Sequence, residues 1–147
     1  MHLRIVAVGK IRERGILDAV QDYYGRIKRY TSFDEVELRD ADEAELIKRF
    51  QKAIPEDARV VALEVEGRMM SSEGLAETIR SERDDLATKN LVFLIGGAYG
   101  LPAEIRALAS LELSLSKMTL PHRLARLFLA EQVYRAFTIL RGEPYSH

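Results

Sequence analysis

The fold class is indicated most clearly by Leu91-Val92-Phe93-Leu94-Ile95-Gly96-Gly97. An apolar run of this length that ends in glycines is typical of a strand buried on both faces. Such strands occur in parallel sheets, where crossover helices cover both faces. Residues 91–95 therefore predict an interior strand of an α/β fold.

Strand-like and helical patterns alternate on both sides of this run. Apolar runs predict four more strands, at residues 3–8, 33–38, 59–65 and 111–115. Gly67 is expected to end the third strand. Apolar residues at helical spacing predict helices at 16–30, 46–54, 75–86, 105–108 and 121–140. Asp40 or Asp42 can cap the second helix, and Ser71 or Ser72 the third. We therefore predict one α/β domain, residues 1–147, with a largely parallel sheet and helices on both faces.

The composition excludes several kinds of site. The 147 residues include no cysteine, which excludes disulfides and thiolate metal ligands. The three histidines, His2, His122 and His147, are far apart in sequence, so no metal site is predicted. No apolar stretch approaches the roughly 18 residues of a membrane span, and no targeting segment is visible. We therefore expect a cytoplasmic protein that binds neither a membrane nor a metal.

The charges are unevenly distributed, although the formal net charge is only −1. Residues 1–31 and 86–147 are net basic, whereas residues 32–85 are net acidic. If the two ends meet in the fold, they form a basic face that can bind phosphates. The alternative is a solvated surface without a binding role.

The helix predicted at residues 121–140 is apolar around its whole circumference. The side chains concerned are Leu124, Leu127, Phe128, Leu129, Val133, Tyr134, Phe137, Ile139 and Leu140. A helix that is apolar on every side must be covered on every side, and one sheet covers only one. We therefore predict a homodimer with this helix in the interface, with burial inside a single chain as the alternative.

Two strand ends and the tail carry groups suited to ligand binding. Ligands of parallel α/β sheets bind beyond the carboxyl ends of the strands, where residues 95–102 place three glycines. Their spacing matches neither a dinucleotide fingerprint nor a P-loop, and a plain turn is the alternative. Residues 115–123 add hydroxyl, amine, imidazole and guanidinium groups, or serve only as a helix cap. The tail, residues 141–147, has groups that can contact a base, or is a disordered end.

Several motifs together resemble one family closely. They are Ile5-Val6-Ala7-Val8-Gly9-Lys10, Leu94-Ile95-Gly96-Gly97 with Gly100-Leu101, Leu115-Ser116 with Met118-Thr119-Leu120-Pro121-His122, Arg126, Ala130-Glu131-Gln132-Val133-Tyr134-Arg135-Ala136, and Pro144-Tyr145. Along its whole length the chain is similar to the RlmH family of large-subunit ribosomal RNA pseudouridine N3-methyltransferases, a minimal branch of the SPOUT methyltransferases. The combination is specific, although no single motif is.

The resemblance implies a fold and a cofactor. The fold is the SPOUT-type α/β fold with a C-terminal trefoil knot, in which the chain after Leu115 passes through a loop. The cofactor is S-adenosyl-L-methionine. The positions implied to bind it are Leu63, Gly96, Gly97, Leu115, Ser116, Lys117, Met118, Thr119 and Leu120. Backbone groups would hold the edges of the adenine, so that apolar side chains need only sandwich the ring.

The resemblance also implies an activity, the methylation of N3 of a pseudouridine in 23S ribosomal RNA. It implies a homodimer that acts on assembled ribosomes, with catalytic roles for His122, Arg126 and Tyr145. Two positions depart from the family pattern. Tyr99 stands where an acidic residue is common, and the tail histidine, His147, comes one position late. A base role is therefore expected of His122 before His147.

Two other functions are compatible with the sequence. One is a SPOUT methyltransferase that acts on a different RNA nucleotide. The other is a ribosome-associated, nucleotide-binding α/β protein without catalysis. The short chain leaves no room for the extra RNA-binding domain that many SPOUT enzymes carry, which favours the minimal family.

Overall fold

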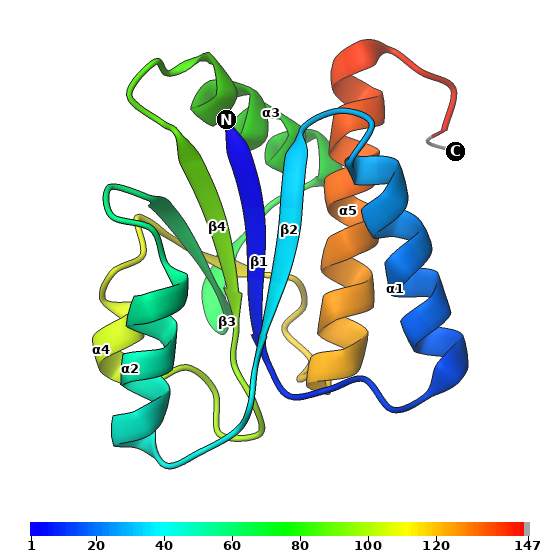
Figure 1. Ribbon diagram of the computed structural model, residues 1–147. Helices are drawn as coiled ribbons and strands as arrows, with labels where there is room; N and C mark the ends of the chain where they lie inside the picture. Colours follow the sequence, from blue (N-terminus) through cyan, green and yellow to red (C-terminus); the bar gives the residue numbers. More distant parts are fainter. Residues whose placement is uncertain (146–147) are drawn as a thin grey trace.

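Five parallel strands form one sheet in a computed structural model that describes residues 1–145 (Figure 1). The strands are β1 (His2–Val8), β2 (Ser32–Leu38), β3 (Arg59–Met69), β4 (Asn90–Ile95) and β5 (Leu111–Ser114). Their order across the sheet is β2-β1-β4-β3-β5. β4 lies at the centre with residues 91–95 buried, which confirms the prediction made from this apolar run.

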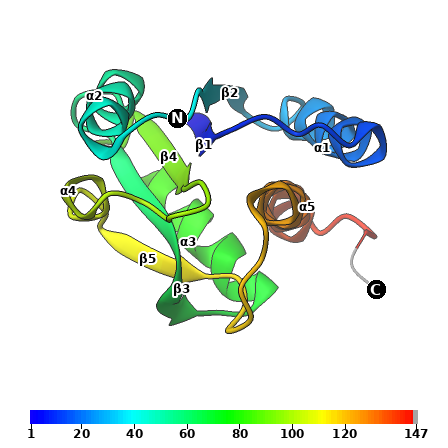
Figure 2. The ribbon, with the colours of Figure 1, turned by 90° about the horizontal axis from the view of Figure 1, so that it is seen from below.

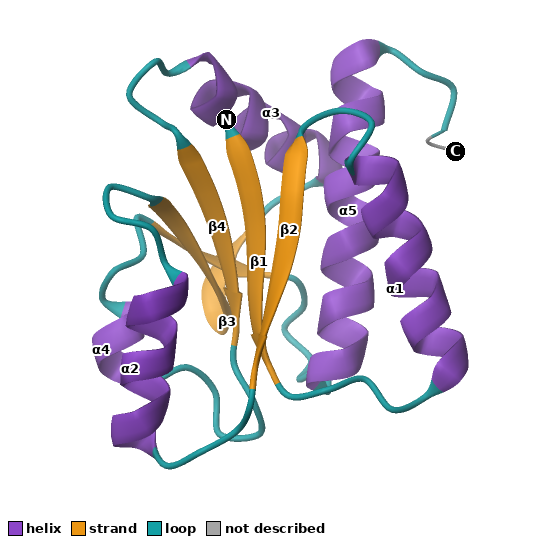
Figure 3. Ribbon diagram, viewed as in Figure 1, coloured by secondary structure: helices purple, strands orange, loops and turns teal. Residues whose placement is uncertain are grey.

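Helices cover both faces of the sheet, as the alternating pattern predicted. They are α1 (Arg14–Ile27), α2 (Glu43–Ala53), α3 (Ser72–Asp84), α4 (Ala103–Arg106) and α5 (His122–Arg141). Figure 2 shows α2 and α4 over one face and α1, α3 and α5 over the other. Figure 3 shows the same layers by secondary structure. The molecule is a three-layer α/β sandwich, and the α/β fold class predicted from the sequence is confirmed.

Side-chain caps fix the starts of two helices. The Asp42 carboxylate accepts a hydrogen bond from the Glu45 backbone N–H at 2.9 Å, and the Ser71 hydroxyl accepts one from Gly74 N–H at 3.0 Å. Each bond satisfies a backbone donor that has no partner within the helix. Of the alternatives predicted from the sequence, Asp42 and Ser71 are the N-caps.

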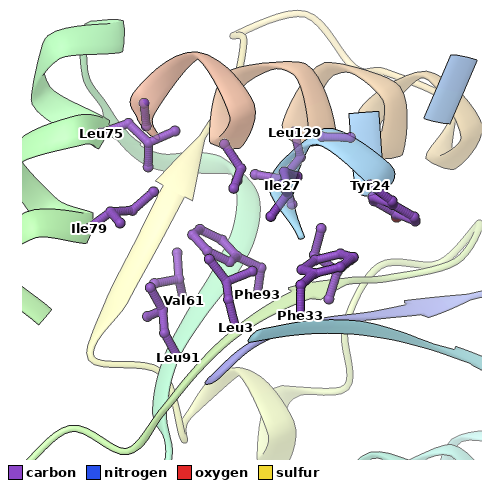
Figure 4. Packing of buried hydrophobic residues seen from close by; sticks show 14 of the residues in the cluster. Leu3, Tyr24, Ile27, Phe33, Val61, Leu75, Ile79, Leu91, Phe93 and Leu129 are labelled. Atoms are coloured by element: carbon purple, nitrogen blue, oxygen red, sulfur yellow. The ribbon is translucent and has the colours of Figure 1, made fainter. Parts of the chain in front are cut away.

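The larger core lies between the sheet and the three-helix layer (Figure 4). Phe93 and Leu3 of the central strands meet Ile27 of α1 and Leu129 of α5, and all four are fully buried. Burial of a side chain of this size stabilises the fold by roughly 1.5–3 kcal/mol. This core holds the central strands in place, and their carboxyl ends support the site described below.

β3 is longer than the sequence predicted. Gly67 was expected to end it, but the strand continues to Met69 and changes its register with β5 between Leu63 and Arg68. A Cβ atom at Gly67 would lie 2.6 Å from the carbonyl oxygen of Glu112. Gly67 therefore allows a close approach of two backbones at the register shift. Glycine inside a strand often marks such an approach and need not end the strand.

The connection between β5 and α5 brings the chain back from the edge of the sheet towards its middle. β5 is the edge strand beside β3, whereas α5 contacts β1 and β4 and packs between α1 and α3 (Figure 2). Residues 115–121 must therefore cross the carboxyl ends of the strands between them. Whether this crossing is threaded as a trefoil knot stays a prediction from the resemblance.

Candidate cofactor and substrate site

A cleft of about 630 Å³ opens at the carboxyl ends of β4 and β5 and beside residues 63–65, in the middle of β3. Most of the positions implied to bind the cofactor line it. They are Leu63, Gly96, Gly97, Leu115, Ser116, Met118, Thr119 and Leu120. Lys117 is exposed and does not line the cleft. The glycine turn, residues 96–100, and the loop before α5, residues 115–121, are separated in sequence by residues 101–114 but share one cavity.

The glycine turn, residues 96–100, is tight, and its first and last residues lie in contact. Gly100 donates its backbone N–H to the Gly97 carbonyl at 3.0 Å, and Gly100 has a φ of 78°, in the left-handed region that favours glycine. A Cβ atom at Gly96 would lie 2.5 Å from the carbonyl carbon of Gly100 and 2.7 Å from the nitrogen of Leu101. Both neighbours are backbone atoms, so the turn keeps its shape only with glycine at position 96.

The facing loop is shaped by hydroxyl groups. Ser114 donates to the carbonyl of Ser116 at 3.0 Å, and the Ser116 hydroxyl accepts from Met118 N–H at 2.9 Å. Local bonds of this kind hold a turn without helix or sheet pairing. They leave Met118 largely exposed at the mouth of the cleft. The loop therefore offers the cleft a preformed wall of backbone and apolar groups.

His122 begins α5 and lines the same cleft. Its Nε2 atom is buried and has no hydrogen-bond partner among the described residues. The ring packs against Gly9, where a Cβ atom would lie 3.3 Å from Nε2, and Gly9 has a φ of 96°. Gly9 thus provides both the turn after β1 and the space for the imidazole. Of the three residues predicted to be catalytic, His122 is the one that lines the cleft.

Arg126 lies one turn further along α5, and its side chain is fully buried. Its Nη2 lies 2.8 Å from a Glu35 carboxylate oxygen and 2.7 Å from one of Glu37, and its Nη1 donates to the Gly9 carbonyl at 3.1 Å. Tyr24 donates a hydrogen bond to Glu35. Burial and the Glu35 carboxylate together raise the pKa of the Tyr24 hydroxyl. The ion pairs tie α5 to β2, and the hydrogen bond to Gly9 ties α5 to the turn after β1. The Arg126 side chain does not line the cleft.

Tyr145 follows the end of α5 and packs back against that helix, and it does not line the cleft. Its hydroxyl donates to Glu131 at 2.8 Å, and its ring centroid lies 4.6 Å from that of Tyr134. Burial raises the pKa of the Tyr145 hydroxyl, and the bonds to Tyr23 and Glu131 add to the rise. The tail up to Tyr145 is therefore docked on the helix. His147 lies outside the described residues.

Glu64 lines the cleft and was missed by sequence reasoning. Its Oε1 atom is buried without a hydrogen-bond partner among the described residues. Burial is the main reason that the pKa of this carboxyl is raised, and the carboxylate of Glu112 adds to the rise against the lowering effect of Arg106. The available signal was the position of an acidic residue at the carboxyl end of a predicted strand.

The residues of this cleft fit a nucleoside cofactor. Leu63, Leu115 and Leu120 provide apolar walls, the glycine turn lets backbone groups approach closely, and Glu64 provides an unpaired acceptor. Within residues 1–145, no three His, Cys, Asp or Glu side chains are grouped so that they could hold a metal ion. In the same residues, no helix is long and apolar enough to cross a membrane.

The fold and the cleft define a SPOUT methyltransferase, and a family model described as "Predicted SPOUT methyltransferase" matches residues 1–147. Proteins of this class take their methyl group from S-adenosylmethionine, the cofactor expected from the sequence. The chain belongs to the RlmH family, ribosomal RNA large subunit methyltransferase H, as its full-length relatives show.

Three such relatives carry the name "Ribosomal RNA large subunit methyltransferase H". The protein of Geotalea daltonii is 44% identical over 154 residues and that of Sorangium cellulosum 45% over 148, each covering 100% of both chains. The protein of Bacillus pumilus is 42% identical over 161 residues and covers 99% of each chain. The resemblance drawn from the motifs is therefore confirmed.

Solved structures support the fold alone. A probable methylase family protein from Haemophilus influenzae superimposes with a TM-score of 0.61 at 16% identity, covering 99% of this chain and 70% of that one. A TrmH/SpoU tRNA modifying enzyme from A. aeolicus gives a TM-score of 0.50 at 11% identity, covering 95% and 77%.

Proposed function

We propose that this chain methylates N3 of a pseudouridine in 23S ribosomal RNA, as a homodimer that acts on assembled ribosomes in the cytoplasm. The observation that carries the proposal is the shared cleft, in which the glycine turn and residues 115–121 face each other beside His122. The names of the full-length relatives support large-subunit ribosomal RNA as the substrate. The whole chain, residues 1–147, acts as one domain.

Methyl transfer requires the side chains mainly to position the methyl donor and the acceptor nitrogen. When bound, the cofactor supplies a methyl group activated by a sulfonium. The chain must hold this group in line with the acceptor nitrogen and accept the N3 proton as the new N–C bond forms. The imidazole of His122, which lines the cleft, is the candidate acceptor of that proton. Arg126 acts indirectly, because its bond to the Gly9 carbonyl holds the turn against which the His122 ring packs.

The RNA is expected to approach over a basic edge of the cleft. The turn after β1 and the start of α5 meet there, as the ion pair between Arg123 and Glu13 at 3.3 Å shows. Lys10, Arg12 and Lys117 are exposed, and in the described part of the chain no carboxylate lies within ion-pair distance of them. Unpaired cations of this kind bind phosphates and release counterions. The net charge of the whole chain therefore does not oppose RNA binding.

Tyr99 should contact the RNA directly. It is 100% exposed at the tip of the rigid glycine turn, where an unpaired base can stack on it. Tyr99→Ala should raise the KM for ribosomes about tenfold, because stacking on an aromatic ring contributes roughly 1–3 kcal/mol per base. Steady-state methyl transfer measures this effect. Tyr99→Phe keeps the ring and should behave as the unmodified chain, and equal KM values for all three proteins would remove Tyr99 from the interface.

The homodimer is proposed to form across one apolar face of α5. This α5 face is lined by Ala19, Tyr23, Leu120, Leu124, Leu127, Phe128, Glu131 and Gln132. Leu124 and Phe128 are 38% and 39% exposed, so the apolar circumference of the helix is not fully covered within one chain. The face adjoins the cleft through Leu120 and the tail through Tyr23 and Glu131, which both contact Tyr145. A second copy seated there would contact both regions.

Phe128→Glu should convert the dimer to a monomer, because it places an unpaired charge in an apolar interface. Sedimentation velocity measures the change in mass. Leu86→Glu is the matched control, since Leu86 is 97% exposed and lies between α3 and β4, outside the α5 face. A dimer that survives Phe128→Glu would show that the interface lies elsewhere.

Methyl transfer from radiolabelled cofactor tests the proposed substrate form. Ribosomes should be labelled much faster than protein-free 23S RNA, because a chain of 147 residues has little surface with which to recognise a site by sequence alone. Equal rates would contradict the requirement for assembled ribosomes.

Titration calorimetry with S-adenosylmethionine separates the enzyme from a non-catalytic ribosome factor, which should give no heat.

A further inference from the structure

We propose that the Glu64 carboxylate, whose side chain lines the cleft and is 20% exposed, is a ligand of the adenosine part of the cofactor and accepts a hydrogen bond from it. The inference rests on the proposed function, because it assumes that the cleft binds S-adenosylmethionine. It adds a carboxylate of β3 to the positions that the resemblance implies for the cofactor, none of which is acidic.

The Oε1 atom of Glu64 is poorly satisfied within the chain. It is buried and has no hydrogen-bond partner among residues 1–145, although the Glu64 side chain as a whole is 20% exposed. The nearest cation is Arg106, whose Nη1 lies 3.9 Å away, beyond hydrogen-bond distance. Arg106 is 44% exposed and lies equally near Glu112, at 3.7 Å. Arg106 is therefore a weak partner shared between two carboxylates.

A buried acceptor atom without a hydrogen-bond partner destabilises the folded chain when no ligand is bound. A buried polar atom without a partner costs about 1–3 kcal/mol, and more if it is charged. Among the described residues, Glu64 is also the one acidic side chain in the lining of the cleft, and it lies there with the apolar Leu63, Val65 and Leu113. A ligand that brings an N–H or O–H donor to this carboxylate would offset the penalty, so Glu64 favours a ligand with donors beside an apolar ring.

The adenosine part has the required chemistry. Its ribose carries two neighbouring hydroxyl donors, its adenine carries an amino donor, and its ring is flat and apolar on both faces. Leu63, the residue beside Glu64, is the β3 position implied to meet the adenosine. An acidic side chain binds the ribose hydroxyl in dinucleotide sites for the same physical reason. The other donor of the cofactor is the ammonium of its amino-acid part, and the experiment must separate the two.

Calorimetric titrations with two ligands test the proposal. S-adenosylhomocysteine contains both parts, whereas 5′-methylthioadenosine contains the adenosine part without the amino acid. Glu64→Ala should weaken the binding of both by about ten- to a hundredfold. Glu64→Gln keeps an acceptor oxygen without the charge and should lose less. Glu66→Ala is the matched control, because Glu66 is exposed on the same strand and does not line the cleft.

Three results would overturn the proposal in different ways. If the unmodified chain binds neither ligand, the proposed function fails and this inference fails with it. If the unmodified chain binds both and Glu64→Ala binds them equally well, only the role of Glu64 fails. If Glu64→Ala weakens S-adenosylhomocysteine but not 5′-methylthioadenosine, the carboxylate contacts the ammonium and the assignment to adenosine is wrong. Thermal unfolding of each variant shows that it is folded.

Discussion

Gly96→Ala should weaken S-adenosylmethionine binding about a hundredfold, a loss of the size that a misplacement of roughly 1 Å can cause in catalysis. The added Cβ atom would lie 2.5 Å from Gly100 and 2.7 Å from Leu101, and both contacts are with backbone atoms. No side chain can rotate to relieve them, so the glycine turn itself must move. Because the turn is one wall of the cleft, its displacement changes the site directly. Titration calorimetry with the cofactor measures the loss.

The matched control is Gly25→Ala. Gly25 lies in α1, where an added Cβ atom meets nothing within 4 Å. Alanine has the higher helix propensity, so this change should stabilise the chain by about 0.5–1 kcal/mol and leave cofactor affinity unchanged. A Gly96→Ala protein that binds the cofactor as well as the Gly25→Ala protein would show that the glycine turn is not part of the site.

Arg126→Met should lower the free energy of unfolding by about 3–5 kcal/mol, the usual effect of removing one partner of a buried ion pair. The change leaves Glu35 and Glu37 without their cation, and the Glu35 side chain is only 15% exposed. It also removes the donor to the Gly9 carbonyl. Urea unfolding at a fixed protein concentration measures the effect, since a dimer's stability depends on concentration.

Two further variants separate the buried charge from the volume of the side chain. Arg80→Met removes an arginine that pairs with Glu77 and Asp84 on the exposed surface of α3, and it should change stability little. Adding Glu35→Gln to Arg126→Met removes one of the uncompensated carboxylates and should recover part of the loss. If the single and the double variant are equally stable, the penalty does not come from the unpaired charge.

The interior strand and the two loops of the cleft could be predicted from the sequence, and the reason is physical. The strand at residues 91–95 is apolar without alternation because β1 and β3 flank it and helices cover both faces. The glycine turn and residues 115–121 each follow a strand of the same parallel sheet, and the carboxyl ends of parallel strands meet at one edge. The resemblance implied cofactor positions in both segments, and the parallel sheet explains why the two can share a site.

The roles of Arg126, Glu64 and Gly67 were not accessible in the same way. Arg126 lies on a helix, but its partners Glu35 and Glu37 belong to β2, so the ion pairs exist only after the helix has packed. The acceptor of Glu64 is left unpaired by the placement of Arg106, which depends on α4. Gly67 was expected to break a strand, but it permits a backbone approach in the register of β3 with β5. Each of these properties depends on long-range packing.

The central claim is that the cleft between the glycine turn and residues 115–121 delivers a methyl group to a pseudouridine. The most direct test is to incubate ribosomes that lack the modification with the chain and labelled S-adenosylmethionine, and to map the labelled nucleotide by mass spectrometry. We expect a single labelled residue in 23S RNA, a pseudouridine methylated at N3, and little label with the Gly96→Ala protein. Label on another nucleotide, on a ribose hydroxyl or on no RNA at all would contradict the account.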